Sequence, residues 1–148
     1  MSASAFAASF SFVAGFAVAL QAAMNTALGR RIGVTETVLL AGLVTTVLVT
    51  AMLLVLRGGL GSLGELGRTP VWMWLGGLMG TIALAAISFA PAKIGVFATL
   101  ALFLGGQLAM GLVIDTLGLL ETPRAGLTAS RLVGVVLVLV GAALVLRR

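Results

Sequence analysis

Five long apolar segments, separated by stretches that contain charged residues, glycine or proline, leave few folds open to this chain. They cover about residues 5–28, 37–56, 71–90, 96–120 and 130–146. Each approaches the ~20 residues that an α-helix needs to cross ~30 Å of hydrocarbon. Because such runs satisfy their backbone hydrogen bonds in lipid as helices, the sequence predicts an all-α integral membrane protein with five transmembrane helices. In this prediction residues 1–148 form a single five-helix membrane domain.

Composition excludes most soluble and enzymatic alternatives. Hydrophobic residues make up 61% of the chain and charged residues 9%, which is more apolar surface than a soluble domain of this length can hide. The sequence has no histidine and no cysteine, so the usual zinc, haem, thiol, Ser-His and Cys-His sites cannot be built. We therefore expect no enzyme, no catalytic residues, no metal and no cofactor.

The basic residues lie at the ends of the apolar segments and are divided almost evenly between the two sides of the membrane. With five helices, the side of the N-terminus carries Arg57, Arg68, Arg124 and Arg131, and the opposite side carries Arg30, Arg31, Lys93, Arg147 and Arg148. They form no basic stripe, so we expect the lipid bilayer and no nucleic acid as a partner.

This balance favours dual topology, because orientation follows an excess of Lys and Arg in the cytoplasmic loops. Copies inserted both ways up would pair as an antiparallel homodimer of ten helices, the inverted-repeat plan of many secondary transporters. The alternatives are a single orientation set by small effects and a partner protein such as an inverted paralogue.

Polar side chains within membrane spans are functional hypotheses, with hydrogen bonding between helices as the alternative. The candidates for a substrate path are Gln21, Asn25, Gln107, Thr81 and Ser88. Asp115, near the end of the fourth segment, opposes the helix dipole. It is either paired with Arg124 or Arg131 or, in an inverted dimer, an ionisable gate at the mouth of the path.

Small residues indicate where helices approach one another. In lipid no hydrophobic driving force brings helices together, so they associate through close packing, which small residues allow. In the first segment Ser11, Gly15, Ala19 and Ala23 recur every four residues. The fifth segment has a seam with alternating spacings of three and four, which we predict to form the dimer contact; packing within the protomer is the alternative. The seam consists of Gly134, Val138, Gly141 and Val145.

No acidic residue lies at the centre of an apolar segment. A transporter that captures cations and protons on a buried carboxylate lacks that residue here, which favours a neutral or zwitterionic solute. Trp72 and Trp74 are interpreted as anchors at the membrane interface.

Several stretches resemble the YdcZ-like five-helix branch of the drug/metabolite transporter superfamily. They are GFAVALQAAMNTALGRR at 15–31, WLGGLMG at 74–80, FAPAKIG at 89–95, GGQLAMGLVIDTLGL at 105–119 and RLVGVVLVLVG at 131–141. The resemblance implies a five-helix protomer that corresponds to half of the ten-helix members. It also implies that Gln21, Asn25, Gln107 and Asp115 occupy recurring polar positions of the family.

We accordingly expect a multi-pass protein of the bacterial inner (cytoplasmic) membrane. It would transport a small polar or zwitterionic metabolite by alternating access between two inverted copies. One alternative is a cation or drug exporter like the small multidrug resistance proteins, which are similar in plan but have four helices and an acid in the first. The other is a non-transporting membrane subunit that pairs with an inverted paralogue.

Overall fold

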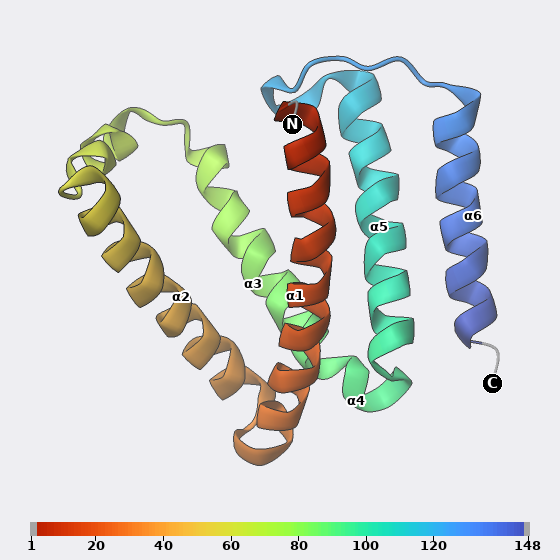
Figure 1. The fold of residues 1–148 in the computed structure, drawn as a ribbon, viewed down its shortest axis with the longest axis horizontal. Helices are drawn as coiled ribbons and strands as arrows, with labels where there is room; N and C mark the ends of the chain where they lie inside the picture. Colours follow the sequence, from red (N-terminus) through yellow and green to blue (C-terminus); the bar gives the residue numbers. More distant parts are fainter. Residues whose placement is uncertain (1–2, 147–148) are drawn as a thin grey trace. The chain divides into compact units, whose positions relative to one another are not determined.

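The computed structural model describes residues 3–146 (Figure 1), and every regular element within that range is a helix. Arg147 and Arg148, two of the basic residues counted for the side opposite the N-terminus, lie outside the described residues. The elements are α1 Ala3–Ile32, α2 Val34–Arg57, η1 Gly61–Arg68, η2 Val71–Trp74, α3 Leu75–Phe89, α4 Pro91–Ile94, α5 Val96–Leu117, η3 Leu119–Glu121 and α6 Ala129–Leu146, with η marking 3-10 helix.

Five stretches of these helices are long and apolar enough to cross a membrane. They are Ser4–Ile32, Val34–Arg57, Val71–Ile94, Val96–Leu117 and Ala129–Leu146. Each overlaps one of the five segments expected from the sequence, so the prediction of an all-α protein with five candidate membrane-spanning helices is confirmed.

The connection between α1 and α2 is much shorter than the sequence suggested, because only Gly33 separates the two helices. Gly33 has a φ of 100°, a left-handed value that costs other residues energy. The Glu36 side chain also occupies the space where a Cβ of residue 33 would lie. The Gly33 N–H donates to the Gly29 carbonyl, and the Gly33 carbonyl accepts from the Thr37 N–H, so the hydrogen bonding of α1 passes directly into α2.

The fourth span ends earlier than expected, at Leu117 rather than about residue 120. Gly118 adopts the left-handed conformation with a φ of 63°, and its N–H donates to the Ile114 carbonyl. This is a usual way for a helix to end. The third span begins with the 3-10 turn η2, and its α-helical part starts only at Leu75.

Contacts divide the chain into two units, which are described separately. Unit 1 combines the start of the chain, up to Ala19, with the part from Ala90 onward, and unit 2 is Leu20–Phe89. In unit 1, α5 lies between the first part of α1 and α6 (Figure 1), with grooves along both lines of contact. Gly105 allows a close approach, since a Cβ there would come within 2.8 Å of Leu139 Cδ2.

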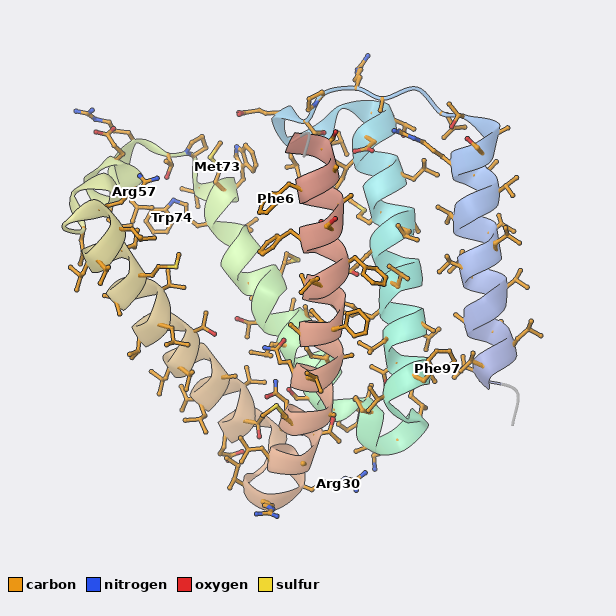
Figure 2. All side chains as sticks on the ribbon, in the orientation of Figure 1. Phe6, Arg30, Arg57, Met73, Trp74 and Phe97 are labelled. Carbon is orange, nitrogen blue, oxygen red and sulfur yellow. The ribbon has the colours of Figure 1, made fainter. Side chains whose placement is uncertain are left out.

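In unit 2, α2 packs against α3, and the last turns of α1 contact α3 through buried polar residues. We call these residues the buried polar crossing; they are Asn25, Thr26, Thr37 and Ser88. Figure 2 shows Arg57, Met73 and Trp74 at one end of this unit and Arg30 at the other. The Trp74 indole Nε1 donates to the Thr69 hydroxyl over 2.9 Å, which holds the ring beside the start of α3. The ends of unit 2 therefore carry the charged and aromatic residues expected at membrane interfaces.

Large apolar side chains are mostly exposed on the single chain. Among the described residues, the hydrophobic ones that are buried are Ala22, Ile87, Ala98 and Ala142. A soluble protein of this length would bury far more. The exposed surface is suited to lipid or to another membrane helix.

Candidate functional site

A groove of about 490 Å³ runs between α5 and α6 in unit 1. The α5 residues that line the groove are spaced three or four apart, or adjacent, so that they lie along one face of the helix. Gly111 and Gly134 leave room on the two sides, since a Cβ on either would meet no atom within 4 Å. The volume lies within the ~300–1,000 Å³ typical of small-molecule sites. The lining residues are Gln107, Leu108, Gly111, Leu112, Asp115, Arg131, Gly134, Val135 and Val138.

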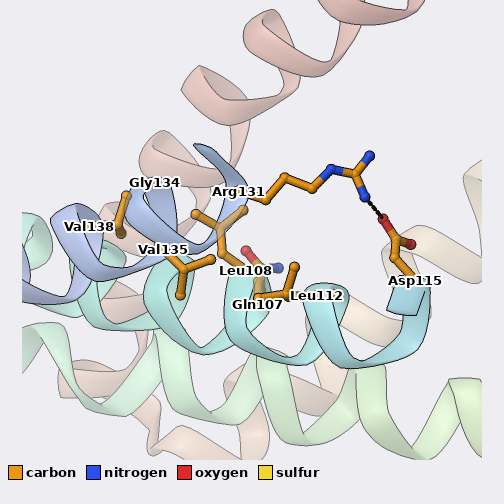
Figure 3. A pocket seen from close by; sticks show the side chains of 9 residues that line it. Gln107, Leu108, Leu112, Asp115, Arg131, Gly134, Val135 and Val138 are labelled. Atoms are coloured by element: carbon orange, nitrogen blue, oxygen red, sulfur yellow. Dashed lines mark ion pairs between the residues drawn. The ribbon is translucent and has the colours of Figure 1, made fainter. Parts of the chain in front are cut away.

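One end of this groove is closed by an ion pair between the two helices (Figure 3). Asp115 Oδ2 lies 3.6 Å from Arg131 Nη1, and the two side chains are 48% and 44% exposed. The separation exceeds the ~2.7–2.9 Å of a strong charge-assisted hydrogen bond, and exposed pairs contribute only about 0–1 kcal/mol. The structure thus pairs Asp115 with Arg131, one of the two partners considered from the sequence, and little energy is needed to part them.

The loop after α5 fixes the position of Asp115. The Arg124 Nε donates to the Leu117 carbonyl over 3.2 Å, and the Ala125 N–H donates to the Asp115 carbonyl over 2.9 Å. Both bonds satisfy carbonyls that a helix end leaves open. The Arg124 charge also stands at the negative end of the helix dipole, where it offsets the unfavourable placement of the Asp115 carboxylate.

Thr128 fixes the start of α6 and with it the position of Arg131. The Thr128 hydroxyl accepts a hydrogen bond from the Arg131 N–H over 3.4 Å, and its carbonyl accepts one from the Leu132 N–H over 3.1 Å. This is the pattern of a helix N-cap, for which threonine is a preferred residue. Arg131 therefore lies in the first turn of α6, opposite the last turns of α5.

Gln107 is the polar residue that two grooves of unit 1 share. It lines the α5–α6 groove and also a groove of about 240 Å³ between α1 and α5, where Gly15 and Phe103 are among its neighbours. Its side chain is exposed and makes no hydrogen bond to any residue in the described range. Its amide is therefore accessible from the grooves on both sides of α5.

Asn25 and Ser88 lie in the buried polar crossing of unit 2 rather than in a groove of the kind described above. Asn25 is 9% exposed, and its Nδ2 has no hydrogen-bond partner among residues 3–146. The hydroxyls of Ser88, Thr26 and Thr37 each donate to a carbonyl four residues earlier in the chain. The Thr26 hydroxyl also lies 3.5 Å from the Ser88 carbonyl, which links α1 to α3.

Gln21 and Thr81, the other two path candidates, are exposed on unit 2. Thr81 donates to the Gly77 carbonyl of its own helix and lines a groove of about 400 Å³ between α2 and α3, together with Thr46. Gln21 lies next to the fully buried Ala22 but points away from the face that the crossing buries. Within unit 2, the structure therefore brings only Asn25 and Ser88 into one cluster.

Residues of the expected dimer seam take part in contacts inside unit 1. Gly134 and Val138 line the α5–α6 groove, and Val145 lies beside Lys93 in a small depression. Gly141 is partly exposed, with room for a side chain. These positions agree with packing within the protomer, and the dimer contact stays a prediction.

Sequence reasoning did not identify the groove itself, nor the buried hydroxyls of Thr26 and Thr37. Thr26 and Thr37 were detectable in principle, since Thr26 follows Asn25 and lies four residues after Ala22 on the same helix face. The groove depends on the rotation of α6 about its axis. In a helix composed almost wholly of Leu, Val, Ala and Gly, no polarity pattern specifies that rotation.

An all-α chain with five candidate spans has the features of a multi-pass membrane protein. A family model described as "Putative inner membrane exporter, YdcZ" matches residues 6–144. The chain therefore belongs to this family, which confirms the resemblance noted in the sequence and the location in the inner membrane. Exporters are transporters rather than enzymes. No curated protein and no solved structure matches the chain.

Proposed function

We propose that this protein transports a small polar or zwitterionic metabolite across the inner membrane. The observation that carries the proposal is the α5–α6 groove, which combines a weak ion pair with an unpartnered amide in an otherwise apolar span. Polar and ionisable groups at membrane depth are costly and usually mark a solute pathway. The family's description as an exporter points to the same class of activity.

The distribution of acidic residues favours such a solute over a cation. Glu36 lies in the first turn of α2, Glu65 in η1 and Glu121 in η3, while Asp115 stands close to the end of α5. All four acids are thus near helix ends or in connections, and Asp115 is already paired. A proton-coupled cation exchanger would need a carboxylate nearer the middle of a span.

Alternating access between two inverted copies is the mechanism we propose, with each protomer acting as one membrane domain. Two observations support an antiparallel dimer: the near-equal division of basic residues in the sequence, and the extensive apolar surface of the isolated protomer. Inversion would place one Asp115 at each mouth of the pathway, where it would act as an ionisable gate. Gln107 would line the path, and Gln21, Asn25, Thr81 and Ser88 remain proposed path residues.

Counterflow in proteoliposomes tests the proposal. Vesicles containing the purified protein are preloaded with one unlabelled solute and diluted into a trace of the same labelled solute. A transporter accumulates the label, whereas protein-free vesicles do not. The panel should contain neutral polar solutes, zwitterionic amino acids and a lipophilic quaternary ammonium cation.

Each outcome selects one function. Accumulation of polar or zwitterionic solutes supports the proposal, while accumulation of the quaternary cation alone would establish the multidrug-type exporter instead. Vesicles that accumulate no solute, with no solute raising the thermal stability of the purified protein, would favour the non-transporting subunit that pairs with an inverted paralogue.

A further inference from the structure

We infer that the α5–α6 groove of unit 1 binds a small zwitterion with an aliphatic side chain, whose carboxylate contacts Arg131 and whose ammonium group contacts Asp115. This inference rests on the proposed function, because it names the class of solute that the transporter carries. It assigns Arg131 as the carboxylate-binding residue and the Asp115–Arg131 pair as the group that the solute displaces.

The charges of the groove favour a zwitterion over a simple cation or anion. Asp115 and Arg131 face each other at 3.6 Å and are both about half exposed, so a solute can reach each of them. A zwitterion replaces the single protein ion pair with two new pairs and leaves the net charge of the site unchanged. A lone cation would bind Asp115 and leave Arg131 unpaired, and a lone anion would do the reverse. A solute with one charge thus forms one ion pair where a zwitterion forms two, and specificity arises from such differences.

The residues that line the groove beyond the ion pair indicate which kind of solute side chain the groove accepts. Between the ion pair and Gln107, the groove is lined by aliphatic side chains and two glycines: Leu108, Leu112, Val135, Val138, Gly111 and Gly134. No aromatic ring and no further polar side chain is among these residues. This part of the groove is therefore complementary to a branched aliphatic group.

Gln107 sets the length of this part of the groove. It precedes Asp115 by eight residues, or about 12 Å along α5 at the rise of an α-helix. Its amide has no hydrogen-bond partner in the part of the chain that the structure describes. A solute of amino-acid size anchored at the ion pair is shorter than this distance and ends before the amide, so Gln107 should influence longer, polar-tipped zwitterions more strongly than short aliphatic ones.

Three compounds with the same branched alkyl group separate these contacts. L-leucine carries both charges, isoamylamine only the ammonium and 4-methylpentanoate only the carboxylate. Binding to the detergent-purified full chain is measured by calorimetry and by thermal shift. We expect L-leucine to bind up to about fivefold more tightly than either single-charge compound, which is the upper range for one half-exposed charged contact.

Variants of the ion pair assign the contacts. Arg131→Gln and Asp115→Asn should each weaken L-leucine binding by up to about fivefold, and Arg131→Gln should leave isoamylamine binding unchanged or stronger because the competing cation is gone. The matched control is Glu65→Gln with Arg68→Gln, which removes an exposed ion pair of 3.2 Å outside the groove. That control should leave L-leucine binding unaltered.

The results distinguish the inference from the proposed function. L-leucine affinity equal to that of both single-charge compounds, or unchanged in Arg131→Gln, would overturn the inference. Counterflow of other polar solutes without binding of L-leucine would overturn it too, while the transport function would stand. L-leucine binding that depends on both charged residues, without any counterflow, would support the site and contradict transport.

Discussion

Replacing Asn25 by leucine is expected to stabilise the protein, even though Asn25 is one of the buried polar residues of unit 2. Its Nδ2 is buried without a hydrogen-bond partner among residues 3–146, and only 9% of the residue is exposed. The neighbouring hydroxyls donate to backbone carbonyls, so their bonds do not depend on the amide. Leucine has a similar size and brings no donor that needs a partner.

The magnitude follows from the burial of this one group. A buried donor without a partner costs about 1–3 kcal/mol. Between membrane helices, measured polar interactions average nearer ~0.6 kcal/mol, because the unfolded helices also find partners. We therefore expect Asn25→Leu to raise the free energy of unfolding by about 1 kcal/mol, or the melting temperature by about 4 °C for a chain of this length.

Titration with SDS, followed by far-UV circular dichroism of the detergent-purified protein, measures the change. Gln21→Leu is the matched control, because Gln21 lies one turn earlier on α1 and is exposed. Its substitution should change the free energy of unfolding by no more than about 0.5 kcal/mol. A lower stability for Asn25→Leu than for Gln21→Leu would refute the reasoning, since it would mean that the amide does hold a partner.

Three further predictions concern the same chain. Thr37→Val should lower the free energy of unfolding by about 1 kcal/mol in the same titration, because it deletes the hydrogen bond from the buried Thr37 hydroxyl to a carbonyl. Gly118→Ala should lower it by about 1–2 kcal/mol, because Gly118 has a left-handed φ, whereas Gly76→Ala, in open space within the third span, should not destabilise. Reporters fused to the C-terminus should give signals on both sides of the membrane. Removing Arg30 and Arg31 should then shift the C-terminal signal toward the periplasm, since the other side would hold the excess of basic residues; an unchanged one-sided signal in both proteins would contradict dual topology.

The location of the spans was predictable because hydropathy is a local property of the sequence. The ends of the helices were less predictable from the sequence. Arg30 and Arg31 looked like a boundary, yet α1 continues through them to Ile32, as long basic side chains can extend from a helix end toward water. The end of α5 depends on the left-handed conformation of Gly118, one of many glycines in the chain and not distinguishable by type alone.

The candidate site was predictable only in part, because it depends on which faces of the helices meet. Gln21 and Asn25, four residues apart, were both candidates for a substrate path, but the buried face of α1 in unit 2 includes Asn25 and leaves Gln21 exposed. Asp115 has the ion-pair partner considered at the outset. The space that this pair borders arises from Gly111 and Gly134, and a glycine in a sequence indicates close packing and open space equally well.

The one-residue link at Gly33 also has a consequence for biosynthesis. Helices joined by long loops can enter the membrane one at a time, each with its own choice of direction. Here α1 and α2 have no intervening segment that the insertion machinery could retain or translocate separately. The two helices must therefore enter together as a hairpin. The direction of the first two spans is then decided in a single event, with Arg30, Arg31 and Glu36 gathered at its tip.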